Sequence, residues 1–274
     1  MKKLIFFFFL TFICLSFRQK ELTWVAIGDS ITYLNDHLYE TGNCVTKGYM
    51  TRVCEQLPYI HYTNQGHNGW TAGMIAQKID SLEITSADIY TVFLGTNDWW
   101  AGRKIGTLAD YQNNTGINTI YGSFRIIMNK LHTLNPQAHI ILITPMQRAD
   151  FVYINDMKNN AYGSYKTKNN QSVEQVAEAV RQVGTVEKCT VIDLYHANKM
   201  SIKHLVNFKR LKNPATGQYE DYQYPAYTQI PFNPQTDAYP YPPEAVNVTF
   251  DGLHPSDKGN AMIAEKLVKI LKDY

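Results

Sequence analysis

Short apolar runs alternate with stretches of helical periodicity along most of the chain. The expected β-strands are residues 23–27, 60–63, 89–94, 139–143 and 190–194. The expected helices are residues 71–81, 117–134, 171–186 and 257–272. Because strands joined by helices form right-handed crossovers, this alternation predicts a parallel sheet with helices on both faces. The length of 274 residues suits one domain of this kind.

The first 16 residues have the pattern of a secretory signal peptide. A basic start precedes an apolar run at residues 4–15 that is too short to span a bilayer. We expect cleavage after Ser16 and a secreted or periplasmic chain without a membrane span, its domain formed by residues 17–274. Lipid anchoring through Cys14 is the alternative, although the residues before it fit that processing poorly.

Charge and cysteine content argue against several classes of partner. Without residues 1–16 the chain has 24 basic and 24 acidic side chains, so nothing indicates a nucleic-acid partner. Cys44, Cys54 and Cys189 are an odd number, which excludes complete internal pairing. Cys44 and Cys54 can pair in an oxidising compartment, but their spacing does not establish it. The sequence has no CxxC or histidine-rich cluster, so we expect no metal or other cofactor.

Residues 196–248 interrupt the alternation of strands and helices. Seven of the 11 prolines and six tyrosines lie there, a composition that excludes a long helix or a central strand. A disordered linker is one interpretation, but the aromatic content favours an ordered insertion packed on the domain. Since Asp251 and His254 follow at once, we expect this insertion to border the functional site and to influence substrate choice.

Ser30, Asp251 and His254 are the candidate catalytic residues. A serine hydroxyl becomes a useful nucleophile when a histidine accepts its proton and a carboxylate orients that histidine. Ser30 follows the first expected strand, and Asp251 and His254 precede the last helix. Ligands of such sheets bind beyond the carboxyl ends of the strands, where these residues are expected to meet. Gly69 and Asn97 follow the second and third strands. If those strands flank the first, the two residues lie on either side of Ser30, as an oxyanion hole requires.

Four sequence blocks resemble the SGNH hydrolases, the GDSL-type esterase and lipase family. They occur in the family's order, as Gly28-Asp-Ser-Ile-Thr32, residues 64–71, Gly95-Thr-Asn-Asp98 and Asp251-Gly-Leu-His-Pro255. The first block has isoleucine where the family name has leucine. The resemblance implies a three-layer α/β/α, flavodoxin-like fold with strand order 2-1-3-4-5.

The resemblance also implies a role for each site residue. Ser30 would be the nucleophile, His254 the general base and Asp251 the residue that orients His254. Backbone N–H groups of Ser30 and Gly69 and the side-chain amide of Asn97 would form the oxyanion hole.

Each of these residues also has a structural interpretation. Ser30 can cap a helix, Asp251 can cap a turn, and His254 can be a surface histidine. Gly69 can serve a tight turn, and Asn97 can bind loop backbone. Three tryptophans in the same loops can contact substrate or pack beneath the loops. These tentative substrate-binding residues are Trp70, Trp99 and Trp100.

The sequence therefore predicts a serine esterase that needs no metal. The expected substrates are short-chain acyl esters of carbohydrates, acetyl esters above all. A lipid or lysophospholipid acylhydrolase is the alternative within the enzymes. A carbohydrate-binding protein with little turnover is the alternative outside them, and the complete set of site residues argues against it.

Overall fold

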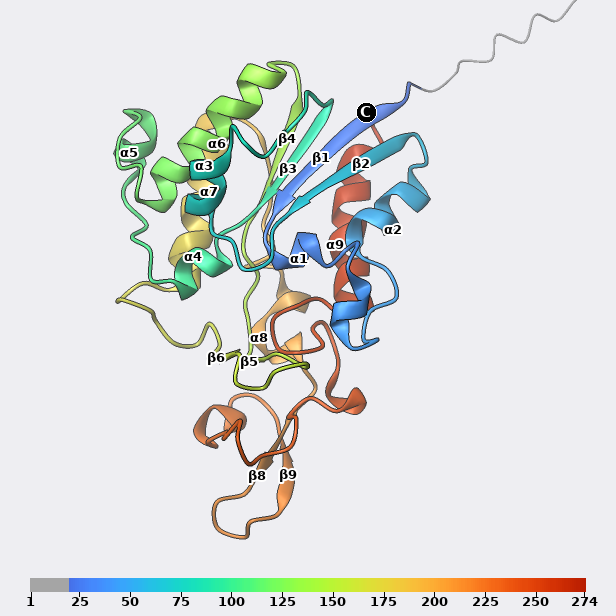
Figure 1. Cartoon of the computed structure of the whole chain (residues 1–274), viewed down its shortest axis with the longest axis vertical. Coiled ribbons are helices and arrows are strands. Elements are labelled where there is room, and N and C mark those ends of the chain that lie inside the picture. Colours follow the sequence, from blue (N-terminus) through green and yellow to red (C-terminus); the bar gives the residue numbers. More distant parts are fainter. Residues whose placement is uncertain (1–19) are drawn as a thin grey trace, which may run out of the picture.

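The centre of the molecule is a five-stranded parallel sheet in the order β2-β1-β3-β4-β7 (Figure 1). It is seen in a computed structural model that describes residues 20–274. The strands are β1 (Leu22–Gly28), β2 (Ile60–Gly66), β3 (Ile89–Phe93), β4 (His139–Ile143) and β7 (Thr190–Ile192). This order confirms the predicted three-layer fold. The fifth position belongs to the seventh strand because a short hairpin intervenes in the chain.

The sheet is apolar on both faces because helices cover both. Along β1, Trp24 and Ala26 face a core that includes α2 (Tyr49–Gln56) and α9 (Asp257–Leu271). Val25 and Ile27 face the opposite core. That core includes α3 (Ala72–Lys78), α6 (Ile120–Leu134) and α7 (Val173–Glu187). Figure 1 shows the two groups of helices on opposite sides of the sheet.

Polar side chains fix where the main helices begin. Thr71, Thr119 and Ser256 accept hydrogen bonds from backbone N–H groups in the first turns of α3, α6 and α9. Ser172 and Gln175 form a capping box at the start of α7. Helix α6 begins three residues later than predicted because Thr119 is its cap. It ends at Leu134, before Asn135 and a proline, as predicted.

Several short elements were not predicted from the sequence. They are α1 (Ser30–Tyr33), α4 (Thr96–Trp100), α5 (Leu108–Gln112), α8 (Ile202–Leu205) and α2. Four 3₁₀ turns lie at Leu38–Thr41, Asn198–Met200, Ala226–Gln229 and Pro243–Ala245. Two antiparallel hairpins complete the structure. They pair β5 (Phe151–Val152) with β6 (Asn160–Ala161), and β8 (Lys209–Lys212) with β9 (Tyr219–Tyr222).

The insertion at 196–248 lies beyond the carboxyl ends of the sheet strands (Figure 1). It contains the β8–β9 hairpin and packs against the core through buried Leu205, Leu211, Tyr227 and Tyr241. Tyr241 donates a hydrogen bond to the carbonyl of Asp150, just before β5. This hydrogen bond holds the insertion against the segment that leads into β5.

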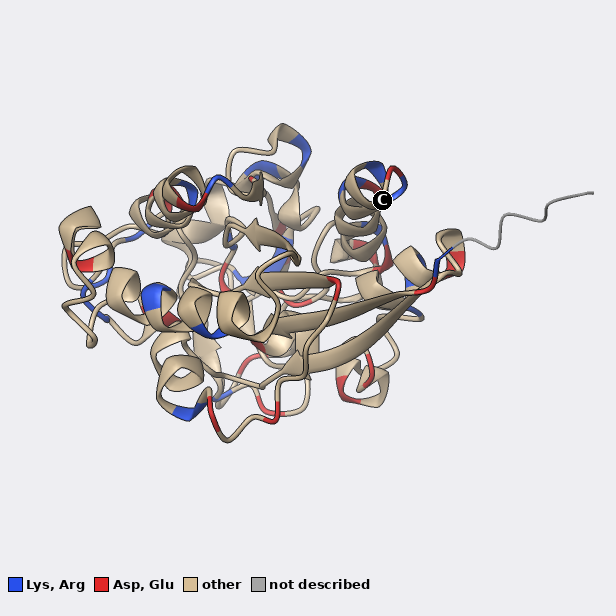
Figure 2. Ribbon diagram, turned by 90° about the horizontal axis from the view of Figure 1, so that it is seen from above, with Lys and Arg blue, Asp and Glu red and all other residues tan. Residues whose placement is uncertain are grey.

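Charges and thiols are dispersed over the described residues. Figure 2 shows Lys and Arg interspersed with Asp and Glu. Cys44, Cys54 and Cys189 are free thiols, so the structure has no bond between Cys44 and Cys54. None of the helices in residues 20–274 is long and apolar enough to cross a membrane. The expected signal peptide at residues 1–16, with Cys14, lies outside the described residues.

Candidate active site

Ser30 is the first residue of α1, directly beyond the carboxyl end of β1. The turn before it is tight, since a Cβ on Gly28 would lie 2.0 Å from Thr32 Oγ1. The side chain of Asp29 caps α1 by accepting a hydrogen bond from Ile31 N at 3.0 Å. The strand and the cap together present Ser30 at the edge of the sheet.

Asp251 and His254 lie in the loop that leads into α9. Gly252 has a left-handed φ of +88°, which lets the chain turn tightly between them. Asp251 Oδ1 accepts hydrogen bonds from Leu253 N at 3.0 Å and from His254 N at 2.7 Å. Asp251 Oδ2 lies 2.7 Å from His254 Nδ1. The carboxylate thus fixes both the loop and the imidazole.

The three predicted catalytic residues meet in one hydrogen-bonded chain. His254 Nε2 lies 2.9 Å from Ser30 Oγ, across 224 residues of sequence. An Nδ1–H that donates to Asp251 leaves Nε2 able to accept the serine proton. Ser30, Asp251 and His254 are 6%, 0% and 7% exposed, so little water competes for these bonds. Such an arrangement can generate a serine nucleophile at neutral pH.

Two phenylalanines hold the His254 ring in place. Phe250 stacks on it with ring centroids 5.9 Å apart, and Phe151 meets its edge at 5.4 Å. Phe151 belongs to a strand whose neighbourhood is tied to the catalytic loop, because Val152 N donates to Asp251 O at 3.1 Å. Sequence analysis missed both phenylalanines, since neither belongs to a motif.

The side chain of Asn97 is hydrogen-bonded to the backbone of the turn that contains Gly69. Asn97 Nδ2 donates to the carbonyl of Trp70 at 3.0 Å, and Gly69 has a φ of +76° in the same turn. His67 N donates to Gly28 O at 3.0 Å, so this turn is also tied to the residues before Ser30. One N–H of the Asn97 amide remains for another acceptor. Their roles in an oxyanion hole stay a prediction.

The three candidate tryptophans have different surroundings. Trp99 is 1% exposed and donates its Nε1–H to Gln171 O, so its ring has no face open to substrate. Its predicted role in substrate binding is therefore wrong, because α4 turns this side chain into the core. Trp70 is half-buried and stacks on His67 at 4.3 Å. Trp100 is half-buried and packs with Phe151 and Leu253, beside the catalytic loop.

Arg148 is a buried cation that sequence analysis did not identify. It is 2% exposed, and its guanidinium lies 5.5 Å from the rings of both Trp99 and Trp100. Burial lowers its pKa to about 10, while Asp251 and nearby carboxylates oppose that shift. Arg148 is therefore protonated at neutral pH. Among the described residues it forms no ion pair, and its Nε has no hydrogen-bond partner.

Two other buried carboxyl groups lie close to the site. Burial raises the pKa of Asp29 to about 6, against the lowering effect of its hydrogen bond from Ile31 N. Burial also raises the pKa of Asp98 to about 6, against the effects of Ala72 N and Arg103. Asp98 Oδ2 accepts from Ala72 N at 2.8 Å and so joins α4 to α3. Within residues 20–274, no group of three or more potential ligand side chains is arranged for a metal ion.

Residues 26–262 match the GDSL-like lipase/acylhydrolase family. The chain belongs to this family. That assignment confirms the predicted resemblance, and the family is one of hydrolases. No curated protein matches the chain.

Solved structures resemble this family member along most of its length. A possible lipase from Chitinophaga pinensis is 62% identical, with a TM-score of 0.91, over 92% of this chain and 98% of that chain. A protein from Lactobacillus plantarum is 19% identical, with a TM-score of 0.63, over 94% and 99%. A catalytic mutant of an acetylxylan esterase from Geobacillus stearothermophilus is 17% identical, with a TM-score of 0.52, over 91% and 94%. The last two similarities concern the fold alone.

Proposed function

We propose that this family member is a serine esterase that removes short acyl groups, chiefly acetyl, from carbohydrates. The observation that carries the proposal is the continuous chain of hydrogen bonds from Ser30 through His254 to Asp251. Its two side-chain distances, 2.9 and 2.7 Å, suit proton transfer from the hydroxyl to the imidazole.

The reaction proceeds in two halves. Ser30 Oγ bonds to the ester carbonyl carbon while His254 Nε2 takes the hydroxyl proton. Asp251 stabilises the imidazolium, and backbone N–H groups of Ser30 and Gly69 with the Asn97 amide hold the oxyanion. The bond to the alcohol breaks as His254 gives its proton to the leaving oxygen. Water then attacks the acyl group on Ser30, His254 takes the water proton, and the acid leaves as Ser30 is reprotonated.

Two cavities of very different size lie near the catalytic residues. The cavity bordered by His254, Ile31 and Phe250 has a volume of about 10 Å³. That is room for about one water molecule, so this cavity itself does not hold an acyl chain. On the side of Phe151 lies a cavity of about 380 Å³ with polar and aromatic walls. The larger cavity gives room for a polar alcohol such as a sugar.

Hydrolysis of graded esters tests this proposal. Purified enzyme should hydrolyse 4-nitrophenyl acetate and acetylated sugars faster than 4-nitrophenyl esters of long acids. Ser30→Ala should lower turnover by several orders of magnitude with an unchanged circular dichroism spectrum. Turnover near that of the wild type in this variant would contradict the role of Ser30.

A lipid acylhydrolase is the second candidate function. The observation that favours it is the 62% identity to a protein described as a possible lipase. The same ester series separates the two candidates, because a lipid enzyme should prefer the longer acyl chains.

Export is part of the proposal. The signal-like residues 1–16 would bring the enzyme to carbohydrates outside the cytoplasm. The mature N-terminus, measured by mass spectrometry, tests this point.

A further inference from the structure

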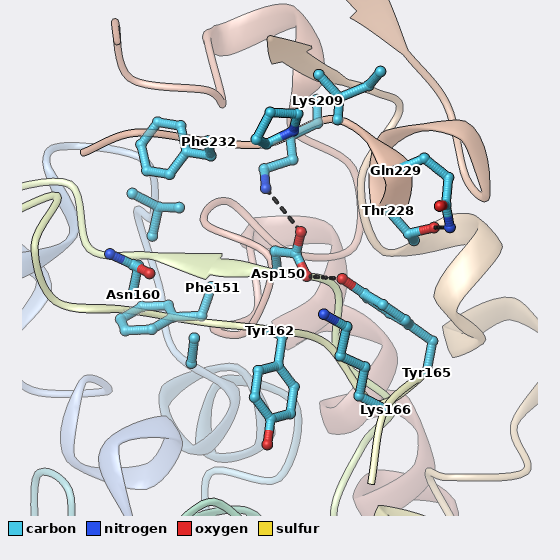
Figure 3. A pocket seen from close by; sticks show the side chains of 14 residues that line it. Asp150, Phe151, Asn160, Tyr162, Tyr165, Lys166, Lys209, Thr228, Gln229 and Phe232 are labelled. Atoms are coloured by element: carbon cyan, nitrogen blue, oxygen red, sulfur yellow. Dashed lines mark hydrogen bonds and ion pairs between the residues drawn. The ribbon is translucent and has the colours of Figure 1, made fainter. Parts of the chain in front are cut away.

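The cavity beside Phe151 has two walls of different origin. The β5–β6 hairpin and the segment after it provide one wall, which includes Asn160, Tyr162 and Lys166. The insertion provides the other through Lys209 and residues 228–232. Figure 3 shows side chains from both walls around the cavity. Because Phe151 lines this cavity and also touches the His254 ring, the cavity adjoins the catalytic residues.

The one carboxylate that lines this cavity is already neutralised. Asp150 Oδ2 accepts a hydrogen bond from Lys209 Nζ at 2.8 Å, and both side chains are largely buried. Asp150 Oδ1 accepts from Tyr165 OH at 2.7 Å and from Gly163 N at 2.9 Å. Figure 3 shows the bonds from Lys209 and Tyr165. Lys209 and Asp150 therefore cancel as charges.

Lys166 and Lys168 remain as unbalanced cations on this side of the site. The lysines that form ion pairs within residues 20–274 are Lys20, Lys47, Lys130 and Lys209. Lys166 Nζ lies 5.3 Å from the centre of the Tyr162 ring, and Lys168 Nζ lies 4.6 Å from that of Trp100. Trp100 and Tyr162 pack against each other at 4.9 Å, with buried Arg148 against the Trp100 ring. Lys166 lines the cavity itself, and Lys168 lies next to it, 5.9 Å from the centre of the Tyr162 ring that forms part of the wall.

We propose that this cavity binds the alcohol part of the ester and that this alcohol is an anionic sugar. Its carboxylate would lie at Lys166 and Lys168, and its ring would lie among the aromatic side chains of the cavity. The amides of Asn160 and Gln229 line the same space and offer donors and acceptors to hydroxyl groups. This inference rests on the proposed esterase function and narrows its substrate class to acetylated acidic carbohydrates.

A matched pair of substrates tests the proposal on the wild-type enzyme. One is an acetylated oligosaccharide that contains a uronic acid, and the other is the same compound after reduction of its carboxyl group to an alcohol. The acidic compound should have the higher kcat/KM, by about fivefold, as expected for two partly exposed ion pairs. Added salt should reduce this preference, because exposed charges are screened.

Variants connect the preference to the two lysines. The double variant Lys166→Gln, Lys168→Gln should bring the ratio of the two kcat/KM values close to one, mainly by raising KM for the acidic compound. Lys269→Gln is the matched control, because Lys269 is exposed on α9, away from this cavity. It should keep the wild-type ratio.

The outcomes distinguish this inference from the function on which it rests. Equal rates on the two sugars, or an unchanged ratio in the double variant, would overturn the anionic site. Hydrolysis of 4-nitrophenyl acetate in the same preparation would show that the esterase itself stands. No hydrolysis of any ester and no labelling by a fluorophosphonate would overturn both proposals.

Discussion

At the scale of single residues, the site depends on side chains that are held before substrate arrives. Asp251 uses one oxygen for two backbone N–H groups and the other for His254. Asn97 uses part of its amide to hold the carbonyl of Trp70. Groups fixed in this way stabilise developing charge without reorganisation during the reaction.

Asn97→Ala should reveal such a role through turnover. The amide is expected to act on charge that develops in the transition state, so kcat should fall by roughly a hundredfold or more with little change in KM. Steady-state kinetics on 4-nitrophenyl acetate measures both constants. Asn68→Ala is the control, since Asn68 is an exposed asparagine in the neighbouring loop. A change confined to KM would make Asn97 a residue for substrate binding instead.

Asp29 should make the stability of the protein depend on pH. Its pKa is about 6 in the folded protein, against an ordinary value of 3.8. Between these two pH values the folded state therefore binds more protons than the unfolded state. The free energy of unfolding therefore falls as pH rises from 4 to 6, by at most about 3 kcal/mol from this group. Asn can keep the hydrogen bond from Ile31 N without a charge.

Urea unfolding of Asp29→Asn and the wild type at pH 4 and pH 7 measures this effect. The variant should lose less stability than the wild type between the two values. An equal loss in both proteins would mean that Asp29 does not carry this pH dependence.

Sequence reasoning located the motif residues but not their neighbours. Ser30, Asp251 and His254 belong to short patterns with a chemical meaning, and the structure brings them together. Arg148 has no such pattern, because its significance comes from the charges and rings that surround it in space. Trp99 was misassigned because adjacent residues on a short helix point in different directions.

At the scale of elements, the sequence predicted those that are long or strongly apolar. All five sheet strands overlap the expected ranges, and so do helices α3, α6, α7 and α9. Helix α2 was missed because its N-cap residue, Gly48, provides no side-chain cap. The hairpin strands have two to four residues each, and pairing with distant chain rather than local propensity stabilises them.

The insertion braces the catalytic loop through hydrogen bonds from tyrosine hydroxyls to backbone carbonyls. Tyr239 OH donates to Val152 O at 3.2 Å, and Tyr241 OH donates to Asp150 O. Val152 N in turn donates to the carbonyl of Asp251. This arrangement gives the tyrosines a structural role beside any effect on substrate choice.

Tyr241→Phe should destabilise the protein although the ring is kept. Tyr241 is 3% exposed. The variant therefore removes the hydrogen bond from the hydroxyl to the carbonyl of Asp150 in a buried place. We expect a loss of about 1–2 kcal/mol in the free energy of unfolding, measured by urea denaturation. Tyr39→Phe, at a residue that is 74% exposed, is the control. Equal stability of the two variants would show that the bond does not brace the loop.

At the scale of the whole molecule, the parallel sheet unites the two ends of the sequence. Ser30 follows β1, an interior strand of the sheet, and His254 precedes α9, which packs on one face of that sheet. The order β2-β1-β3-β4-β7 places the loops after β2 and β3 on either side of Ser30. The fold thus explains why residues from four separate segments can serve one reaction.

The most direct test of this account is to locate the reactive serine. The enzyme is treated with a fluorophosphonate, digested and analysed by mass spectrometry. We expect a single adduct on Ser30, absent from Ser30→Ala and strongly reduced in His254→Ala, because only a serine activated by histidine reacts readily. An adduct on another residue, or undiminished labelling of Ser30→Ala, would contradict the proposed mechanism.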